Sequence, residues 1–204
     1  MIYILVISFY FVMLALVVVG FVLHPNNTMR QNAQQKVSVI IAARNEEGKI
    51  KQCVASIIDQ NFPKQFLEII IVDDASTDNT FNEAAELLSR SGIEHRILQN
   101  QEHLGKKKSL KLAIEQSNSE IIICRDADTF TISNNWLSSI VNYMGITKRE
   151  FVICPIAIDH KNGMLSSLQE TEMAVLSLFT ISSAYFNVPF LANGANLALS
   201  LIHI

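Results

Sequence analysis

Two carboxylates spaced one residue apart, Asp126 and Asp128, follow a short apolar run, Ile121–Cys124. Such a run, rich in β-branched residues, is typical of a buried strand, and the ligands of open α/β sheets bind where the strands end. Two unit charges about 4 Å apart repel by about 1 kcal/mol in water and about 4 kcal/mol at an effective dielectric near 20. A divalent cation would reverse this repulsion, and Mg²⁺ is commonly held by one or two carboxylates together with substrate phosphates. The spacing therefore favours a cation site for a nucleotide diphosphate, with a simple turn as the alternative interpretation.

Polar residues also follow three other predicted strands. They are Arg44 and Asn45 after residues 37–43, Asp73 and Asp74 after residues 67–72, and Gly105 and Lys106 after residues 94–98. The carboxyl ends of parallel strands meet at one edge of a sheet, so we expect these residues on one rim with Asp126 and Asp128. A lysine there could offset phosphate charge, while the carboxylates hold a metal or contact a base or a ribose. We expect Lys107 and Lys108 to belong to a solvated helix face.

The elements that must position this rim alternate between strands and helices. Apolar patterns predict strands near 37–43, 67–72, 94–98, 121–125 and 151–157, and helices around 50–58, 81–88, 110–114, 135–144 and 165–185. This alternation predicts an α/β domain whose mostly parallel sheet is covered by helices on both faces. The strand at 94–98 is shorter and more polar, so we expect it at or near an edge. The helix at 165–185 is amphipathic and lies either at a membrane or against the core.

The amino-terminal segment has a different character. Residues 2–23 carry no charge over about 22 residues, or about 33 Å as a helix, which is enough to span a bilayer. We interpret residues 1–24 as an uncleaved transmembrane anchor and residues 25–36 as a linker. A cleaved signal peptide is the alternative, and it would need a basic segment before a shorter apolar core. Because Arg30, Lys36 and Arg44 follow the span, the positive-inside rule predicts a cell-membrane protein whose main body is cytoplasmic.

Composition narrows the range of partners. The 204 residues are 50% hydrophobic and carry a formal net charge of −3, which gives no support for nucleic-acid binding, since that usually needs a basic face. The chain has three cysteines, Cys53, Cys124 and Cys154, at wide spacings without a metal-binding pattern. We interpret them as buried, reduced side chains.

Several motifs resemble those of family 2 glycosyltransferases of the GT-A fold, particularly bacterial membrane-anchored members. They are VSVIIAARNE at 37–46, IVDDASTDNT at 71–80, the Gly105-Lys106 pair, the Asp126-X-Asp128 motif, residues 168–172 and NGANLA at 193–198. The likeness covers residues 37–198, which we interpret as one glycosyltransferase domain. Ala75 stands where the family usually has glycine.

The resemblance implies transfer of a sugar, with inversion, from a nucleotide diphosphate sugar such as a UDP-sugar to the hydroxyl of a saccharide or lipid-linked acceptor in cell-envelope or exopolysaccharide synthesis. Carried over residue by residue, the nucleotide-sugar pocket comprises Arg44, Asn45, Glu46, Asp73, Asp74, Lys106 and Asp126. Asp126 and Asp128 would bind Mg²⁺ or Mn²⁺, and Asn193 with Gly194 would belong to the acceptor region. The metal would neutralise charge on the leaving diphosphate, and the sugar would pass through an oxocarbenium-like state.

The carboxyl-terminal end departs from the family pattern. The family's general base is expected beyond the NGAN segment, past the end of this sequence, so we predict little transferase activity for the chain as given. Residues 199–204, LSLIHI, match the translation of a sequencing adapter, and we interpret them as a non-native tail, with a natural terminus as the alternative. Other functions considered are a membrane-tethered nucleotide-sugar-binding protein without catalysis, a nucleotidyltransferase, and a phosphatase of the haloacid dehalogenase type.

Overall fold

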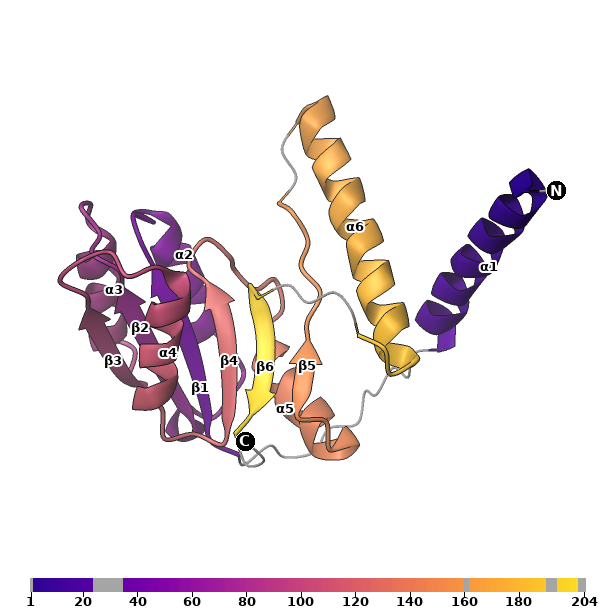
Figure 1. The fold of residues 1–204 in the computed structure, drawn as a ribbon. Helices are drawn as coiled ribbons and strands as arrows, with labels where there is room; N and C mark the ends of the chain where they lie inside the picture. The colour runs from indigo at the N-terminus through magenta and orange to yellow at the C-terminus, as the bar shows by residue number, and fades with distance from the viewer. Residues whose placement is uncertain (1, 24–34, 160–161, 190–193, 202–204) are drawn as a thin grey trace. The chain divides into compact units, whose positions relative to one another are not determined.

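The computed structural model describes residues 2–23, 35–159, 162–189 and 194–201. The chain divides into two compact units, one made of residues 1–27 with 155–193 and the other of residues 28–154 with 194–204. The second unit contains a six-stranded sheet with the strand order β3-β2-β1-β4-β6-β5 (Figure 1). The strands are β1 (Val37–Ala43), β2 (Leu67–Asp73), β3 (Glu94–Gln99), β4 (Ile121–Asp126), β5 (Phe151–Ile153) and β6 (Asn196–Ser200).

Four of these strands are parallel. β1 pairs with β2 and β4, and β2 pairs with β3, all in the same direction. β6 runs antiparallel to both β4 and β5. The predicted mostly parallel α/β sheet is confirmed, and the polar β3 lies at an edge as expected.

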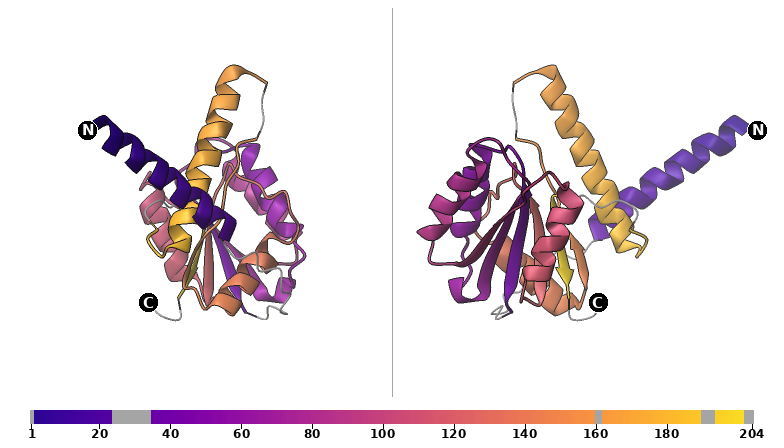
Figure 2. Two further views of the ribbon diagram at one scale, coloured as in Figure 1. Left: turned by 90° about the vertical axis from the view of Figure 1, so that its right-hand side faces the viewer. Right: turned by 60° about the vertical axis from the view of Figure 1, so that its left-hand side comes forward.

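Helices cover both faces of the sheet because the strand side chains alternate between two apolar layers. On one face Val39, Ile41 and Ile123 pack with the buried side chains of α2 (Lys49–Ile58), α3 (Thr80–Ser89) and α5 (Trp136–Thr147). On the other face Ile40 and Ile122 pack against α4 (Lys106–Gln116). The two views of Figure 2 show α4 separated from α2 and α3 by the sheet. Each fully buried isoleucine contributes roughly 1.5–3 kcal/mol.

Two expectations at the carboxyl-terminal side of the sheet are corrected. The strand predicted over 151–157 ends at Ile153, since Pro155 has no N–H to continue the ladder. The last link is the bond from the Cys154 N–H to the Asn196 carbonyl, 3.0 Å. The sequence pattern also missed β6, which includes Leu199 and Ser200 and pairs them with Ile122 and Ile121 of β4.

The first unit contains two long helices, α1 (Ile2–Leu23) and α6 (Met164–Tyr185). α1 is long and apolar enough to cross a membrane, judged by its length and composition alone. The two helices approach closely: the Ser182 hydroxyl donates a 2.6 Å hydrogen bond to the Val17 carbonyl, and a Cβ added at Gly20 would stand 2.8 Å from the Ser182 Cα. Glycine at position 20 therefore permits this helix contact.

Candidate active site

The carboxyl ends of the parallel strands lie side by side at one edge of the sheet. Ala43 of β1 is in register with Asp73 of β2, and Asp73 is in register with Gln99 of β3. On the other side of β1, Ala42 is in register with Asp126 of β4. The loops that carry the sequence-predicted site residues therefore leave the sheet along one rim.

The loop after β1 is held by the loop after β2. The Asn45 N–H donates to the Ser76 hydroxyl (3.0 Å), and the Asn45 side-chain carbonyl accepts from the Thr77 N–H (2.8 Å). The Glu46 N–H donates to the Thr80 hydroxyl (2.8 Å). Asn45 has φ +53°, a left-handed conformation that Asn tolerates better than most residues. These bonds fix the turn and leave the side chain of the preceding Arg44 exposed.

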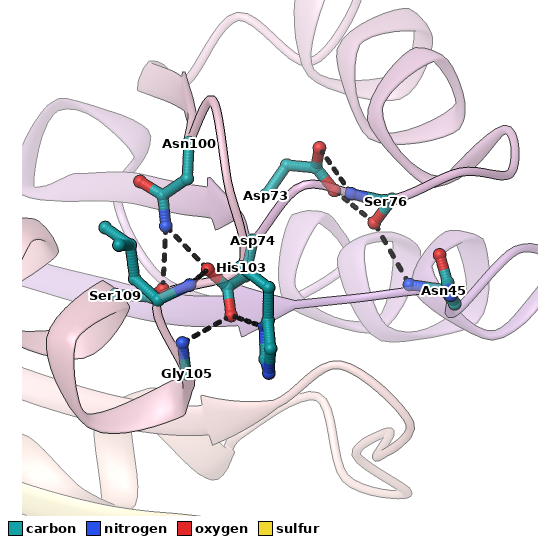
Figure 3. Close-up of polar contacts among 9 residues, drawn as sticks. Asn45, Asp73, Asp74, Ser76, Asn100, His103, Gly105 and Ser109 are labelled. Atoms are coloured by element: carbon teal, nitrogen blue, oxygen red, sulfur yellow. Dashed lines mark hydrogen bonds and ion pairs between the residues drawn. The ribbon is translucent and has the colours of Figure 1, made fainter.

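The loop before α4 is held by Asp74, whose side chain is buried (Figure 3). One carboxylate oxygen accepts from the Leu104 N–H and the Asn100 amide, both 2.8 Å, and the other accepts from the Gly105 N–H (2.8 Å) and pairs with the His103 ring (2.7 Å). Burial alone would raise the pKa of Asp74, but the hydrogen bonds from Leu104, Asn100, Gly105 and His103 together hold the pKa well below its usual range.

Asp73 is also buried, and its carboxylate is hydrogen-bonded to other protein groups. Its carboxylate accepts hydrogen bonds from the Ser76 hydroxyl and from the Gln99 amide, the latter at 3.0 Å (Figure 3 shows the Ser76 contact). Both members of the Asp73-Asp74 pair thus support loops in this structure.

Asp126 and Asp128 are more accessible. The Asp126 carboxylate forms an ion pair with the Lys106 ammonium at the start of α4, with an N–O distance of 2.5 Å. The Asp126 side chain is 29% exposed and the Lys106 side chain 52%. Asp128 is exposed in the turn after β4. The Glu46 carboxylate, hydrogen-bonded to the Lys49 ammonium, raises the pKa of Lys49, and the charge of Asp128 adds to this effect. The charge of Asp128 is therefore felt by Lys49 at the start of α2, while Asp126 contacts Lys106 at the start of α4.

Behind this turn lies a buried cation, Arg125, which is 3% exposed. Its Nε and Nη2 donate to the Thr129 hydroxyl (3.2 and 3.0 Å), and its guanidinium stacks 4.5 Å from the centre of the Trp136 ring. Burial lowers the pKa of Arg125, although an arginine stays charged at neutral pH. We gave Arg125 no role from the sequence, although a charged residue inside a buried strand was a signal.

The cysteines do not take part in this chemistry. Cys53, Cys124 and Cys154 are free and buried, as predicted. Burial raises the pKa of Cys53 and of Cys154 to about 12, and it also raises the pKa of Cys124. These thiols are therefore protonated and unreactive at neutral pH.

The donor set suits a hard cation that is shared with a ligand. Among the described residues, no group of three or more His, Cys, Asp or Glu side chains could hold a metal by itself. Asp126 and Asp128 offer two accessible carboxylates at this rim, so a cation held by them would take its further ligands from phosphate oxygens and water. This composition is typical of Mg²⁺ and Mn²⁺ sites.

Only one of the two residues predicted for the acceptor region, Gly194, lies within the described residues. Asn193 lies outside the described residues, and Gly194 is exposed shortly before β6. Within β6, the Asn196 side chain accepts a hydrogen bond from the Trp136 Nε1–H (3.2 Å).

Solved structures define the class of fold. A mannosyltransferase from Pyrobaculum calidifontis, PcManGT, in complex with GDP-Man and Mn²⁺, aligns with a TM-score of 0.72 at 18% identity, over 92% of this chain and 51% of that one. Staphylococcus aureus TarS 1-349 in complex with UDP-GlcNAc aligns with a TM-score of 0.56 at 25% identity, over 63% of this chain and 36% of that one. The fold is that of the GT-A glycosyltransferases, as the sequence predicted.

The family follows from sequence. The family model "Glycosyl transferase family 2" matches residues 38–197, and the chain belongs to this family. A probable glycosyltransferase of Bacillus subtilis, YdaM, is 35% identical over 48% of this chain and 24% of its own length. Poly-beta-1,6-N-acetyl-D-glucosamine synthase of Staphylococcus aureus is 28% identical over 69% of this chain and 33% of its own length. The chain thus spans about a quarter to a third of these relatives.

Proposed function

We propose that this chain carries the donor-binding part of a glycosyltransferase that moves a sugar, with inversion, from a UDP-sugar to a hydroxyl of a saccharide or lipid-linked acceptor. Family membership supports the reaction class. The relatives that make poly-beta-1,6-N-acetyl-D-glucosamine, and the TarS structure that holds UDP-GlcNAc, favour a UDP-sugar donor and cell-envelope or exopolysaccharide synthesis.

The observation that carries the proposal is the contact between Lys106 and Asp126. A lysine from one loop and a carboxylate from another meet at the strand ends, next to the exposed carboxylate of Asp128. When a nucleotide diphosphate binds, this ion pair can separate. The ammonium then offsets phosphate charge, and the carboxylate becomes a cation ligand. A bound Mg²⁺ or Mn²⁺ would stabilise the charge that develops on the leaving diphosphate.

The remaining residues take supporting roles in the proposed pocket. Arg44, Asn45 and Glu46 border the nucleotide, with the Arg44 side chain exposed and free to reach a phosphate or a ribose. Because Asp73 and Asp74 are occupied by loop donors, we propose that either one contacts the uracil or ribose only by exchanging one of its present partners. Gly194, with Asn193, is proposed to border the acceptor.

Isothermal titration of the full chain in detergent with UDP, with and without Mn²⁺, tests the site. Asp128→Asn keeps the shape of the side chain and removes its charge. We expect UDP to bind more tightly with Mn²⁺, and Asp128→Asn to abolish most of that gain. Asp59→Asn, on the exposed carboxyl-terminal cap of α2, is the matched control and should behave as wild type. UDP affinity that is independent of both Mn²⁺ and Asp128 would refute the assignment.

We further propose that α1 anchors the protein in the cell membrane with the sheet unit on the cytoplasmic side. The uncharged α1 and the basic residues Arg30, Lys36 and Arg44 that follow it support this orientation. A membrane anchor would keep the enzyme close to a lipid-linked acceptor.

A further inference from the structure

Arg125 is a charged side chain in a place that disfavours charge. It lies on a strand whose other residues are apolar or at the site, and it is almost completely buried. Removing a charge from water is costly unless nearby groups compensate for the loss. Here the compensation comes from two specific partners: the face of Trp136 and the hydroxyl of Thr129.

Thr129 links this cation to the turn that carries Asp128. Its hydroxyl accepts from Arg125 and donates to the carbonyl of Asp126 at 2.7 Å, and its backbone N–H donates to the same carbonyl at 3.2 Å. Because Arg125 supplies only donors, the Thr129 proton is directed toward the carbonyl. The four-residue turn from Asp126 to Thr129 is therefore closed by two bonds, and the guanidinium orients the one made by the Thr129 hydroxyl.

Trp136 links the same cation to the start of β6. Its ring face covers Arg125, and its Nε1–H donates to the Asn196 side chain. Asn196 is also the residue in register with Arg125 across the β4–β6 pair. The guanidinium thus lies between the Asp126–Thr129 turn and the first residue of β6.

We infer that Arg125 is a positioning residue that, through Thr129 and Trp136, holds the Asp126–Thr129 turn in the conformation that presents Asp128 to a nucleotide-bound divalent cation. The side chains of Asp126 and Arg125 make separate contacts, with Lys106 of α4 and Trp136 of α5 respectively. The part of this inference that concerns cation and nucleotide binding rests on the proposed function. Partners that orient metal ligands typically change metal affinity by about 10-fold to 100-fold when they are removed.

Variants at Arg125 and Thr129 test separately the charge of the arginine and the hydroxyl of the threonine. Arg125→Met removes the cation and keeps an extended apolar side chain, while Arg125→Lys keeps the charge and removes the planar guanidinium that stacks on the ring. Thr129→Val removes only the hydroxyl, and Thr129→Ser restores it. Arg90→Met, at the exposed carboxyl-terminal end of α3, controls for the loss of an arginine.

The first measurement is the Kd of the full chain for UDP with and without Mn²⁺. We expect Arg125→Met and Thr129→Val each to raise the Kd with Mn²⁺ by about 10-fold or more and to leave the metal-free Kd nearly unchanged. The double variant should be no worse than the more severe single one, because both break the same link. Thr129→Ser should bind as wild type, and Arg125→Lys should recover part of the loss, because it keeps the charge without the planar pair of donors. Equal losses with and without Mn²⁺, or no loss, would overturn the inference.

A second measurement needs no nucleotide and so decides the inference independently of the proposed function. Hydrogen exchange of the Thr129 amide reports directly on the turn, since this amide is bonded to the Asp126 carbonyl. We expect faster exchange there in Arg125→Met and Thr129→Val, with core amides such as those of β1 unchanged. Wild-type exchange at Thr129 in both variants would refute the positioning role even if UDP binds.

Discussion

At the scale of residues, the two acidic pairs of the rim have different surroundings. Asp73 and Asp74 are buried and hydrogen-bonded to loop groups, whereas Asp126 is partly exposed and Asp128 is exposed. The sequence shows both pairs in the same way, as carboxylates after a buried strand. What separates them is the supply of hydrogen-bond donors: Asp74 is bonded by the loop at residues 100–105, and Asp73 is bonded by Ser76 and by Gln99. Except for Ser76, these donors lie more than 20 residues further along the chain, so the local pattern does not show them.

Asp74→Asn should lower stability at neutral pH. The pKa of Asp74 is held below its unfolded value of about 3.9. The carboxylate therefore adds stability above that pH, and this contribution is lost as the pH falls through the folded pKa. Because bonds to charged groups are each worth about 1.5–3 kcal/mol, we expect a loss of about 2 kcal/mol. Thermal unfolding at pH 7 and pH 3 should show the difference from wild type shrinking at pH 3. A constant difference would contradict this account.

Lys106→Gln should change metal and nucleotide binding in opposite directions. The variant removes the ammonium that competes with a cation for Asp126, so Mn²⁺ affinity without nucleotide should rise. An exposed ion pair is worth at most about 1 kcal/mol, which limits the rise to about fivefold. UDP affinity should fall, since a positive charge near the phosphates is lost. Lys107→Gln, an exposed neighbour, is the control for both titrations. A parallel change in both affinities would contradict the exchange of partners at Asp126.

At the scale of elements, the predictable parts are those encoded by continuous local patterns. The parallel strands β1, β2 and β4 are apolar runs, and α2 follows a clear helical period, so sequence was sufficient for them. β6 is five residues, NLALS, with a weak alternation. Its identity as a strand depends on an antiparallel partner, β4, that is distant in sequence. A local reading could not supply that information.

Gly105→Ala should misplace the start of α4. Gly105 has φ +88° and ψ 154°, a combination that is essentially restricted to glycine. A Cβ there would meet no atom within 4 Å, so the cost is one of backbone strain, about 1–3 kcal/mol. We expect a lower unfolding temperature and weaker UDP binding, because Gly105 precedes Lys106 and donates to Asp74. Gly194→Ala has the same free space without positive φ and is the control for stability. Equal stability of the two variants would argue against strain at Gly105.

At the scale of the whole molecule, the proposed membrane attachment and the proposed donor binding fall to different units. α1 and α6 make up the described helices of one unit, and the sheet with the site belongs to the other. The proposed anchor predicts that the chain resists extraction from membranes by alkaline carbonate. Replacing Met13 and Leu14 with Arg should release it, since each arginine at the centre of a span costs about 2.5–3.5 kcal/mol. Ile132→Arg, exposed in the sheet unit, controls for added charge. Retention of the double variant in the pellet would contradict an α1 anchor.

The insertion of β6 between β4 and β5 has a consequence for biosynthesis. β5 pairs with β6 and is not a neighbour of β4 in the sheet. The edges of β4 and β5 that face β6 therefore stay unpaired until residues 196–200 have left the ribosome. Because translation adds about 5–20 residues per second, the apolar β4 keeps an unpaired edge for several seconds. An unpaired strand of this kind is prone to intermolecular association. Slow translation between β4 and β6 should therefore increase the demand for chaperones while the protein is being made.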